Sequence, residues 1–168
     1  MKKMFFILPA VAIFAFANKP QLDEGKKLPS VNIKDMGGNP INTAEVSNDG
    51  KPILITFWAT YCKCCKLGLN TIAEEYETWQ VETGVKVIAV SVDDQKTAST
   101  VEPMVNAAGW EYDVWMDTNG EFKRAMGVNQ TPHTFILDGN GNIVFTHNNF
   151  APGDEELLYE QIKLLTNQ

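Results

Sequence analysis

Residues 53–65 read ILITFWATYCKCC, an apolar run that leads directly into a cluster of cysteines. The segment Ile53–Trp58 is almost continuously apolar and rich in β-branched residues, which is typical of a strand buried on both faces of a sheet. All three cysteines of the chain follow within Cys62-Lys63-Cys64-Cys65. Because cysteines this close together crosslink no distant segments, we interpret them as chemically active rather than as stabilising.

The residues after the cysteines predict a helix and then a second buried strand. Apolar residues recur at spacings of three and four with glutamates between them, which indicates an amphipathic helix. They are Cys65, Leu69, Ile72, Tyr76 and Trp79. The segment Val85–Val92 again has the pattern of a buried strand. Strand, helix and strand make a βαβ unit with parallel strands, so the CxxC motif is expected at the carboxyl edge of the sheet, where α/β proteins place their sites.

The rest of the chain continues this alternation of strands and helices. The expected elements are a hairpin of Val31–Lys34 and Pro40-Ile41, a helix over Val101–Ala108 that starts or bends near Pro103, a strand at Tyr112–Met116, a short helix at Gly120–Met126, a hairpin of Thr134–Leu137 and Ile143–Thr146, and a last helix from Asp154. The pattern predicts an α/β fold in one domain.

The first residues predict export. Lys2 and Lys3 precede an apolar run, Met4–Ala17, whose end has the small-x-small form of a cleavage site. The run is shorter than the roughly 20 residues that span a bilayer as a helix, and it contains Pro9. We therefore expect residues 1–17 to be a signal peptide, and residues 18–168 to be the mature domain in a periplasmic or otherwise extracytoplasmic location.

The charge of the chain argues against one class of partner. The chain has 14 basic and 21 acidic residues, which gives a formal net charge of −7. Cleavage of the signal peptide would remove Lys2 and Lys3 and change this charge to −9. Binding of nucleic acid requires a basic surface, and the sequence shows none. We expect no nucleic-acid partner.

Several segments together carry a family resemblance. They are Phe57–Cys62 with the CxxC motif, Val90–Asp94, Gly127-Val128, Thr131-Pro132 and Phe135–Asp138 with Gly141. In this combination and order the chain resembles the TlpA-like thiol-disulfide oxidoreductases, which are exported proteins of the thioredoxin-fold superfamily. The resemblance implies a thioredoxin-like fold: a central mixed β-sheet flanked by helices, with the N-terminal hairpin and an inserted helix-strand segment. It also implies that Thr131-Pro132 is a cis-proline loop facing the cysteines.

The same resemblance implies an enzymatic function. The protein would exchange a Cys62–Cys65 dithiol or disulfide with the thiols and disulfides of exported proteins, acting as a reductant. Its electrons would pass to or from a membrane-embedded donor or acceptor protein. No bound cofactor is expected.

The roles of the three cysteines follow from their positions. Cys62 at a helix N-terminus meets unpaired N–H groups and the positive end of the helix dipole, so its pKa is expected below that of free cysteine. Lys63 adds a nearby cation. Cys65 lies one turn later on the apolar side and would resolve the mixed disulfide that Cys62 forms. Because neighbouring side chains diverge on a helix, we predict a Cys62–Cys65 disulfide, with Cys64 as the free thiol.

Aromatic and backbone groups near the motif are candidates for substrate binding. Trp58, Tyr61 and Pro132 offer apolar contact, and the backbone of Thr131 could pair with an extended partner segment. The other tryptophans, Trp110 and Trp115, are assigned to the core.

Three positions depart from the pattern of the family. Thr56 and Gly68 stand where an acidic proton acceptor is usual, so that role falls to Asp93, Asp94 or a water. Asn70 replaces a common proline, which predicts a straighter helix.

A fourth departure opens an alternative function. Cys64 stands where the family usually has proline, and it is either inert, a second resolving thiol or a metal ligand. Cys62, Cys64 and Cys65 with His133 would form a soft sulfur and nitrogen set suited to Cu(I) or Zn²⁺. The alternative to the enzyme is therefore a metallochaperone-like protein of the same fold.

Overall fold

The computed structural model describes residues 25–166. Strand β4, Ile53–Trp58, lies at the centre because all six of its residues are buried, as the apolar run predicts. Parallel to it lies β5, Lys86–Ser91, and helix α1, Lys63–Thr83, connects the two. The predicted βαβ unit is confirmed, and it places residues 59–65 at the carboxyl edge of β4.

The remaining elements include all the expected ones in their expected order, together with the short strand β1 and two 3-10 turns that the sequence did not predict. They are β1 (Lys26–Lys27), β2 (Asn32–Asp35), β3 (Pro40–Asn42), the 3-10 turn η1 (Thr43–Glu45), the 3-10 turn η2 (Ala98–Thr100), α2 (Val101–Ala108), β6 (Asp113–Met116), α3 (Glu121–Ala125), β7 (His133–Leu137), β8 (Asn142–Asn148) and α4 (Asp154–Thr166). Pro103 lies in the first turn of α2, where a helix does not need its missing N–H.

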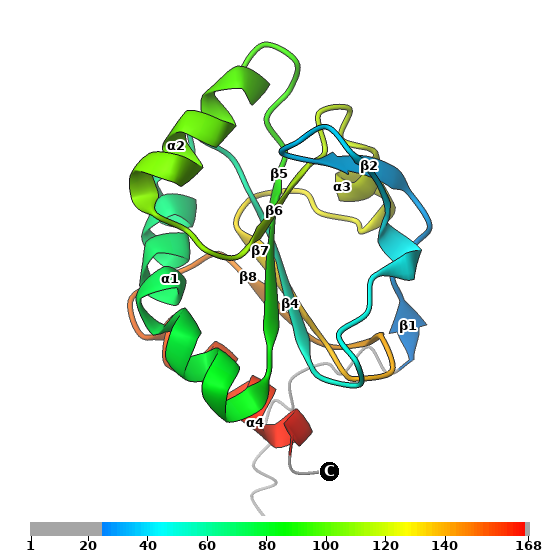
Figure 1. Cartoon of the computed structure of the whole chain (residues 1–168), viewed down its shortest axis with the longest axis vertical. Coiled ribbons are helices and arrows are strands. Elements are labelled where there is room, and N and C mark those ends of the chain that lie inside the picture. Colours follow the sequence, from blue (N-terminus) through cyan, green and yellow to red (C-terminus); the bar gives the residue numbers. More distant parts are fainter. Residues whose placement is uncertain (1–24, 167–168) are drawn as a thin grey trace, which may run out of the picture.

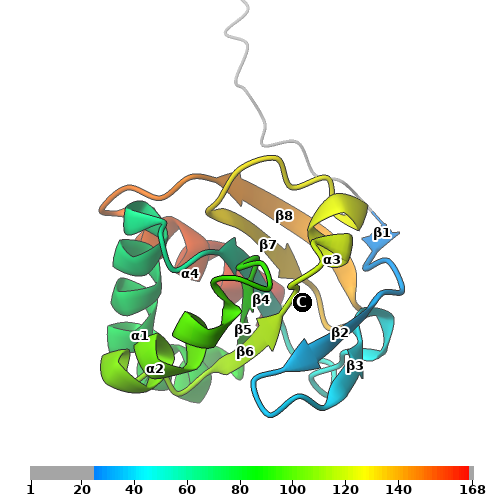
Figure 2. The same ribbon diagram turned by 90° about the horizontal axis from the view of Figure 1, so that it is seen from above.

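The strands form one mixed sheet that curls around its central members, as Figure 2 shows. Their order is β1-β8-β7-β4-β5-β6-β2-β3. Strands β4, β5 and β6 are parallel neighbours, whereas β7 pairs antiparallel with β4 and β8 antiparallel with β7. The predicted N-terminal hairpin is present as β2 and β3, and β2 extends the sheet by pairing with β6.

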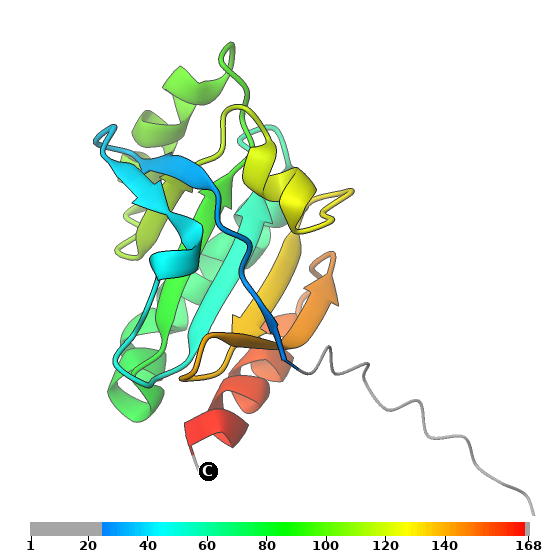
Figure 3. The ribbon, with the colours of Figure 1, turned by 90° about the vertical axis from the view of Figure 1, so that its right-hand side faces the viewer.

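Helices cover both faces of this sheet (Figure 1). Helices α1, α2 and α4 pack on one face over a core that includes Leu54, Cys65 and Ile162. Helix α3 and the N-terminal strands lie over the other face, as Figure 3 shows, and enclose a second core that includes Phe57 and Phe122. Alternate residues of β4 thus serve different cores, which explains its continuous apolar character.

Helix α1 runs without a break through Asn70. It ends at Gly84, whose φ of 67° is the left-handed conformation that glycine adopts readily, and whose N–H donates to the carbonyl of Gln80. Within residues 25–166, no helix has the length and apolar character needed to cross a membrane. The predicted signal peptide, residues 1–17, lies outside the described residues.

Candidate active site

The CxxC motif begins helix α1 directly after strand β4. A tight turn joins them, in which the backbone N–H of Cys62 donates to the carbonyl oxygen of Ala59 at 3.0 Å. Cys62 is the N-cap residue of α1, and its Sγ accepts the backbone N–H of Cys65 at 3.2 Å. The Cys62 sulfur therefore lies at the helix N-terminus, where free N–H groups and the helix dipole favour negative charge.

A disulfide joins Cys62 and Cys65, whose Cα atoms lie 5.3 Å apart, and Cys64 is the free cysteine. This confirms the predicted pairing. Cys65 is 1% exposed, whereas Cys62 is partly exposed. Because a partner sulfur must reach the sulfur that it attacks, Cys62 is the accessible member of the pair.

The Thr131-Pro132 loop lies beside the motif. Its peptide bond is cis, and the Thr131 carbonyl oxygen lies 3.8 Å from the Sγ of Cys62. The loop precedes β7, whose pairing with β4 runs from His133 opposite Phe57. The antiparallel pairing of β7 with β4 therefore brings the loop to the edge of the sheet that carries Cys62, as the resemblance implies.

The apolar contact surface predicted around the motif is smaller than expected. Tyr61 is 72% exposed and available to a partner. Trp58, in contrast, is fully buried and packs edge-on against Trp110, with ring centroids 5.0 Å apart. Pro132 is buried as well. The expected apolar contact of Trp58 is therefore corrected to a packing role beneath α1, and the buried ring of Pro132 offers a partner little surface. Trp110 and Trp115 are core residues as predicted.

His133 is not part of the cysteine cluster. The only group of potential metal ligands within the described residues consists of the three cysteines. The His133 ring stacks on Phe135 of the second core, with centroids 4.3 Å apart, and its Nε2 lies 2.9 Å from the Oγ1 of Thr146. Burial, and secondarily the charge of His147, lowers the pKa of His133. The four-ligand set expected from the sequence is therefore reduced to three sulfurs.

Asp93 supports the turn before the motif. Its carboxylate is fully buried and accepts the backbone N–H of Thr60 at 2.9 Å, the Thr60 hydroxyl at 2.5 Å and the Ser91 hydroxyl at 2.9 Å. These bonds hold the chain two residues before Cys62. The structure thus gives the Asp93 carboxylate a positioning role that the sequence did not indicate.

The other positions discussed for proton transfer also have local partners. Asp94 is exposed and accepts the backbone N–H groups of Lys96 and Thr97, which lower the pKa of its carboxyl group. Thr56 is buried and accepts a hydrogen bond from the hydroxyl of Thr134 at 2.9 Å. No hydrogen bond among the described residues links either Asp93 or Asp94 to Cys65.

Only glycine fits at position 68 without a steric clash, because a residue far away in the sequence packs against it. The ring of Phe150, in the loop between β8 and α4, packs against helix α1 at Gly68. A Cβ atom there would lie only 2.7 Å from Cγ of Phe150. One turn after Cys65, an aromatic ring therefore takes the space where a side chain would stand. Asn70 has a different use, because its Oδ1 accepts the indole N–H of Trp110 at 2.8 Å.

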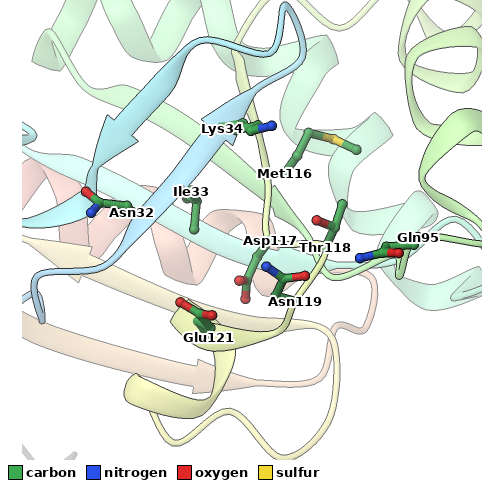
Figure 4. A pocket seen from close by; sticks show the side chains of 9 residues that line it. All are labelled: Asn32, Ile33, Lys34, Gln95, Met116, Asp117, Thr118, Asn119 and Glu121. Atoms are coloured by element: carbon green, nitrogen blue, oxygen red, sulfur yellow. The ribbon is translucent and has the colours of Figure 1, made fainter.

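A separate polar pocket of about 230 Å³ lies at the same edge of the sheet but contains no cysteine. Figure 4 shows Asp117 and Asn119 between Ile33 of β2 and Glu121 of α3. The buried Asp117 carboxylate accepts the backbone N–H groups of the first turn of α3, at Phe122 and Lys123. Burial raises the pKa of Asp117. This pocket is therefore built around the start of α3, and the thiol chemistry lies elsewhere.

Known proteins similar to this chain include thiol-disulfide oxidoreductases, in agreement with the cysteine pair described above. The model of the AhpC/TSA family matches residues 25–146. The thiol-disulfide oxidoreductase ResA of Bacillus subtilis (strain 168) is 30% identical over 129 residues, which cover 77% of this chain and 69% of the relative.

Two solved structures share the fold over most of their length. An uncharacterized thioredoxin-like protein from Porphyromonas gingivalis is 45% identical with a TM-score of 0.76, covering 83% of this chain and 92% of that one. A protein described as thiol:disulfide interchange protein DsbE from Chlorobium tepidum is 26% identical with a TM-score of 0.75, covering 86% and 99%. With a disulfide at the start of α1 and a cis-proline loop beside it, the chain belongs to the AhpC/TSA family and is a TlpA-like thiol-disulfide oxidoreductase with a thioredoxin-like fold.

Proposed function

We propose that this oxidoreductase works outside the cytoplasm and reduces disulfides of exported proteins through Cys62 and Cys65. The observation that carries the proposal is the asymmetry of the pair: Cys62 is partly exposed at the helix N-terminus, and Cys65 is 1% exposed behind it. The Cys62 sulfur is accessible to a large partner, whereas the Cys65 sulfur can react only with Cys62, in the second exchange.

The reaction consists of two exchanges. The Cys62 thiolate attacks one sulfur of the substrate disulfide, forms a mixed disulfide and releases the other substrate sulfur as a thiolate, which takes up a proton. The Cys65 thiolate then attacks the Sγ of Cys62, so that the Cys62–Cys65 disulfide forms and the second substrate thiol leaves. Two electrons pass from the protein to the substrate. The N–H of Cys65, which donates to the Cys62 sulfur, supports the negative charge of the attacking thiolate.

Thr131 and Tyr61 are the proposed contacts for an extended substrate segment. The Thr131 carbonyl lies 3.8 Å from the Cys62 sulfur, so a partner strand that pairs with the Thr131 backbone would bring its own sulfur to Cys62. The exposed ring of Tyr61, the residue directly before Cys62, adds apolar contact. Lys63, exposed at the first position of α1, contributes positive charge near the thiolate.

Export and regeneration complete the proposal. The apolar run Met4–Ala17 after two lysines supports secretion with cleavage near residue 17. A reductant in an oxidising compartment needs a source of electrons, and a membrane-embedded donor protein is the proposed one. The reduction potential decides the direction, because a potential above that of the substrates would make the protein an oxidant instead.

Insulin reduction by the purified residues 18–168 tests the reaction. We expect Cys62→Ser to abolish turnover, Cys65→Ser to trap mixed disulfides, and the matched control Cys64→Ser to remain active. Retained turnover in Cys62→Ser would contradict the mechanism. Cell fractionation of the full chain, with residues 1–17 present or deleted, tests the location, and cytoplasmic retention of the full chain would contradict export.

A further inference from the structure

The third cysteine lies close enough to the redox pair to complete a metal site. The Sγ of Cys64 is 3.6 Å from the Sγ of Cys62, and all three sulfurs lie within 4.8 Å of one another. They come from the N-cap and the first turn of α1, so one rigid element holds their backbones. Cys64 is itself half-buried and takes no part in the disulfide.

Reduction would change this cluster from one thiol and a disulfide into three thiols. Around a metal with metal–sulfur bonds of about 2.3 Å, three sulfurs in a plane stand roughly 4.0 Å apart. The Cys62 and Cys64 sulfurs are already near that spacing. Once the disulfide opens, the Cys65 sulfur has to move away from that of Cys62 to complete the triangle.

The number of ligands selects the metal. Thiolates favour soft ions such as Cu(I) and also bind Zn²⁺, but structural zinc sites need four ligands. Within the described residues the cluster has three members, and the ring of His133 is engaged with Phe135 and Thr146. A three-sulfur set therefore fits Cu(I) better than Zn²⁺.

The charge of the complex also fits its position. Three thiolates and one Cu(I) carry a net charge of −2, and the N-terminus of α1 favours negative charge. Lys63 and Lys66 follow on the same first turn and add two cations.

We propose that the reduced protein binds one Cu(I) through Cys62, Cys64 and Cys65, and that this binding and disulfide exchange exclude each other. Binding releases whatever protons the three thiols still carry and leaves the oxidation state of copper unchanged. Formation of the Cys62–Cys65 disulfide removes two ligands, so oxidation by a substrate disulfide expels the metal. The exclusion rests on the proposed function, because it requires Cys62 to be the attacking sulfur.

Anaerobic titration of the reduced protein with Cu(I), against a colorimetric Cu(I) chelator, tests the site. We expect one equivalent bound by the wild type, an affinity at least tenfold lower in Cys64→Ser, and no binding by the oxidised protein. The control Glu77→Gln, an exposed change farther along α1 that keeps all thiols, should bind within a few-fold of the wild type. Equal affinity in Cys64→Ser would overturn the proposal, as would tighter binding of Zn²⁺ than of Cu(I).

A single-turnover insulin assay with pre-reduced protein separates this proposal from the proposed function. Without copper, the wild type and Cys64→Ser should both reduce insulin. At a chelator-buffered Cu(I) level that saturates only the wild type, its rate should fall at least tenfold while that of Cys64→Ser is unchanged. An inactive copper-free wild type would refute the proposed function and leave the titration result standing. Full activity of the copper-saturated wild type would overturn the exclusion.

Discussion

Substitution of Gly68 by alanine tests how tightly the loop after β8 is packed on the active-site helix. The added Cβ would lie 2.7 and 2.8 Å from two ring atoms of Phe150. The ring cannot move away easily, because Phe150 is only 8% exposed and hydrogen bonds hold both of its neighbours in the chain. The N–H of Asn149 donates to the carbonyl oxygen of Pro132, and the N–H of Ala151 donates to the Asp154 carboxylate. We expect the substitution to destabilise the oxidised protein.

Two opposing effects determine how much Gly68→Ala changes the free energy of unfolding. Replacing a glycine inside a helix by alanine gains about 1 kcal/mol, because alanine loses less backbone entropy on folding. Forcing an extra carbon into a packed site costs about 1–3 kcal/mol. The clash is therefore expected to win by about 1 kcal/mol, which lowers the melting temperature of a domain of this size by about 3 °C.

The double mutant isolates the cause. In a Phe150→Ala background the clash is gone, so Gly68→Ala should stabilise by about 1 kcal/mol, a reversal of sign. Denaturant unfolding of the four oxidised proteins measures both steps, with the exposed Glu77→Ala on the same helix as a control for general changes. If Gly68→Ala destabilises equally with and without the Phe150 ring, the packing argument is refuted.

Two further predictions concern Asp93 and His133. Asp93→Ala leaves the buried donors of Thr60 and Ser91 without an acceptor, so we expect a loss of about 3 kcal/mol in urea unfolding, and a loss below 1 kcal/mol would contradict its positioning role. The pKa of His133 is lowered by burial and by the charge of His147. A lowered folded-state pKa gives stability that is complete above the unfolded value of about 6.5 and is lost as the pH falls through the folded value. Unfolding at pH 7.5 and pH 5 should therefore show an acid-side loss that His133→Gln reduces, and an identical loss in the variant would count against this assignment.

Local patterns in the sequence determined much of this protein. The buried run Ile53–Trp58 and the apolar spacing after Cys65 predicted β4, α1 and the position of the motif, because strand and helix periodicity depends on neighbouring residues. The Cys62–Cys65 pairing followed from the geometry of one helical turn, and Thr131-Pro132 was assigned from the family resemblance. The two-residue strand β1 was missed, since Lys26 and Lys27 are exposed and charged and show no strand pattern.

Only the tertiary structure decided which side chains reach the site. His133 lies next to Pro132 in sequence, but its ring stacks on Phe135 in the second core, because residues two apart in a strand share a face. Trp58 precedes the motif by four residues and is nevertheless fully buried, since it alternates with Phe57 and falls on the face covered by α1. The contact of Phe150 with Gly68 joins segments that no local pattern connects. Side-chain direction and long-range packing depend on the whole sheet and its covering helices, and so they become visible only once the chain is folded.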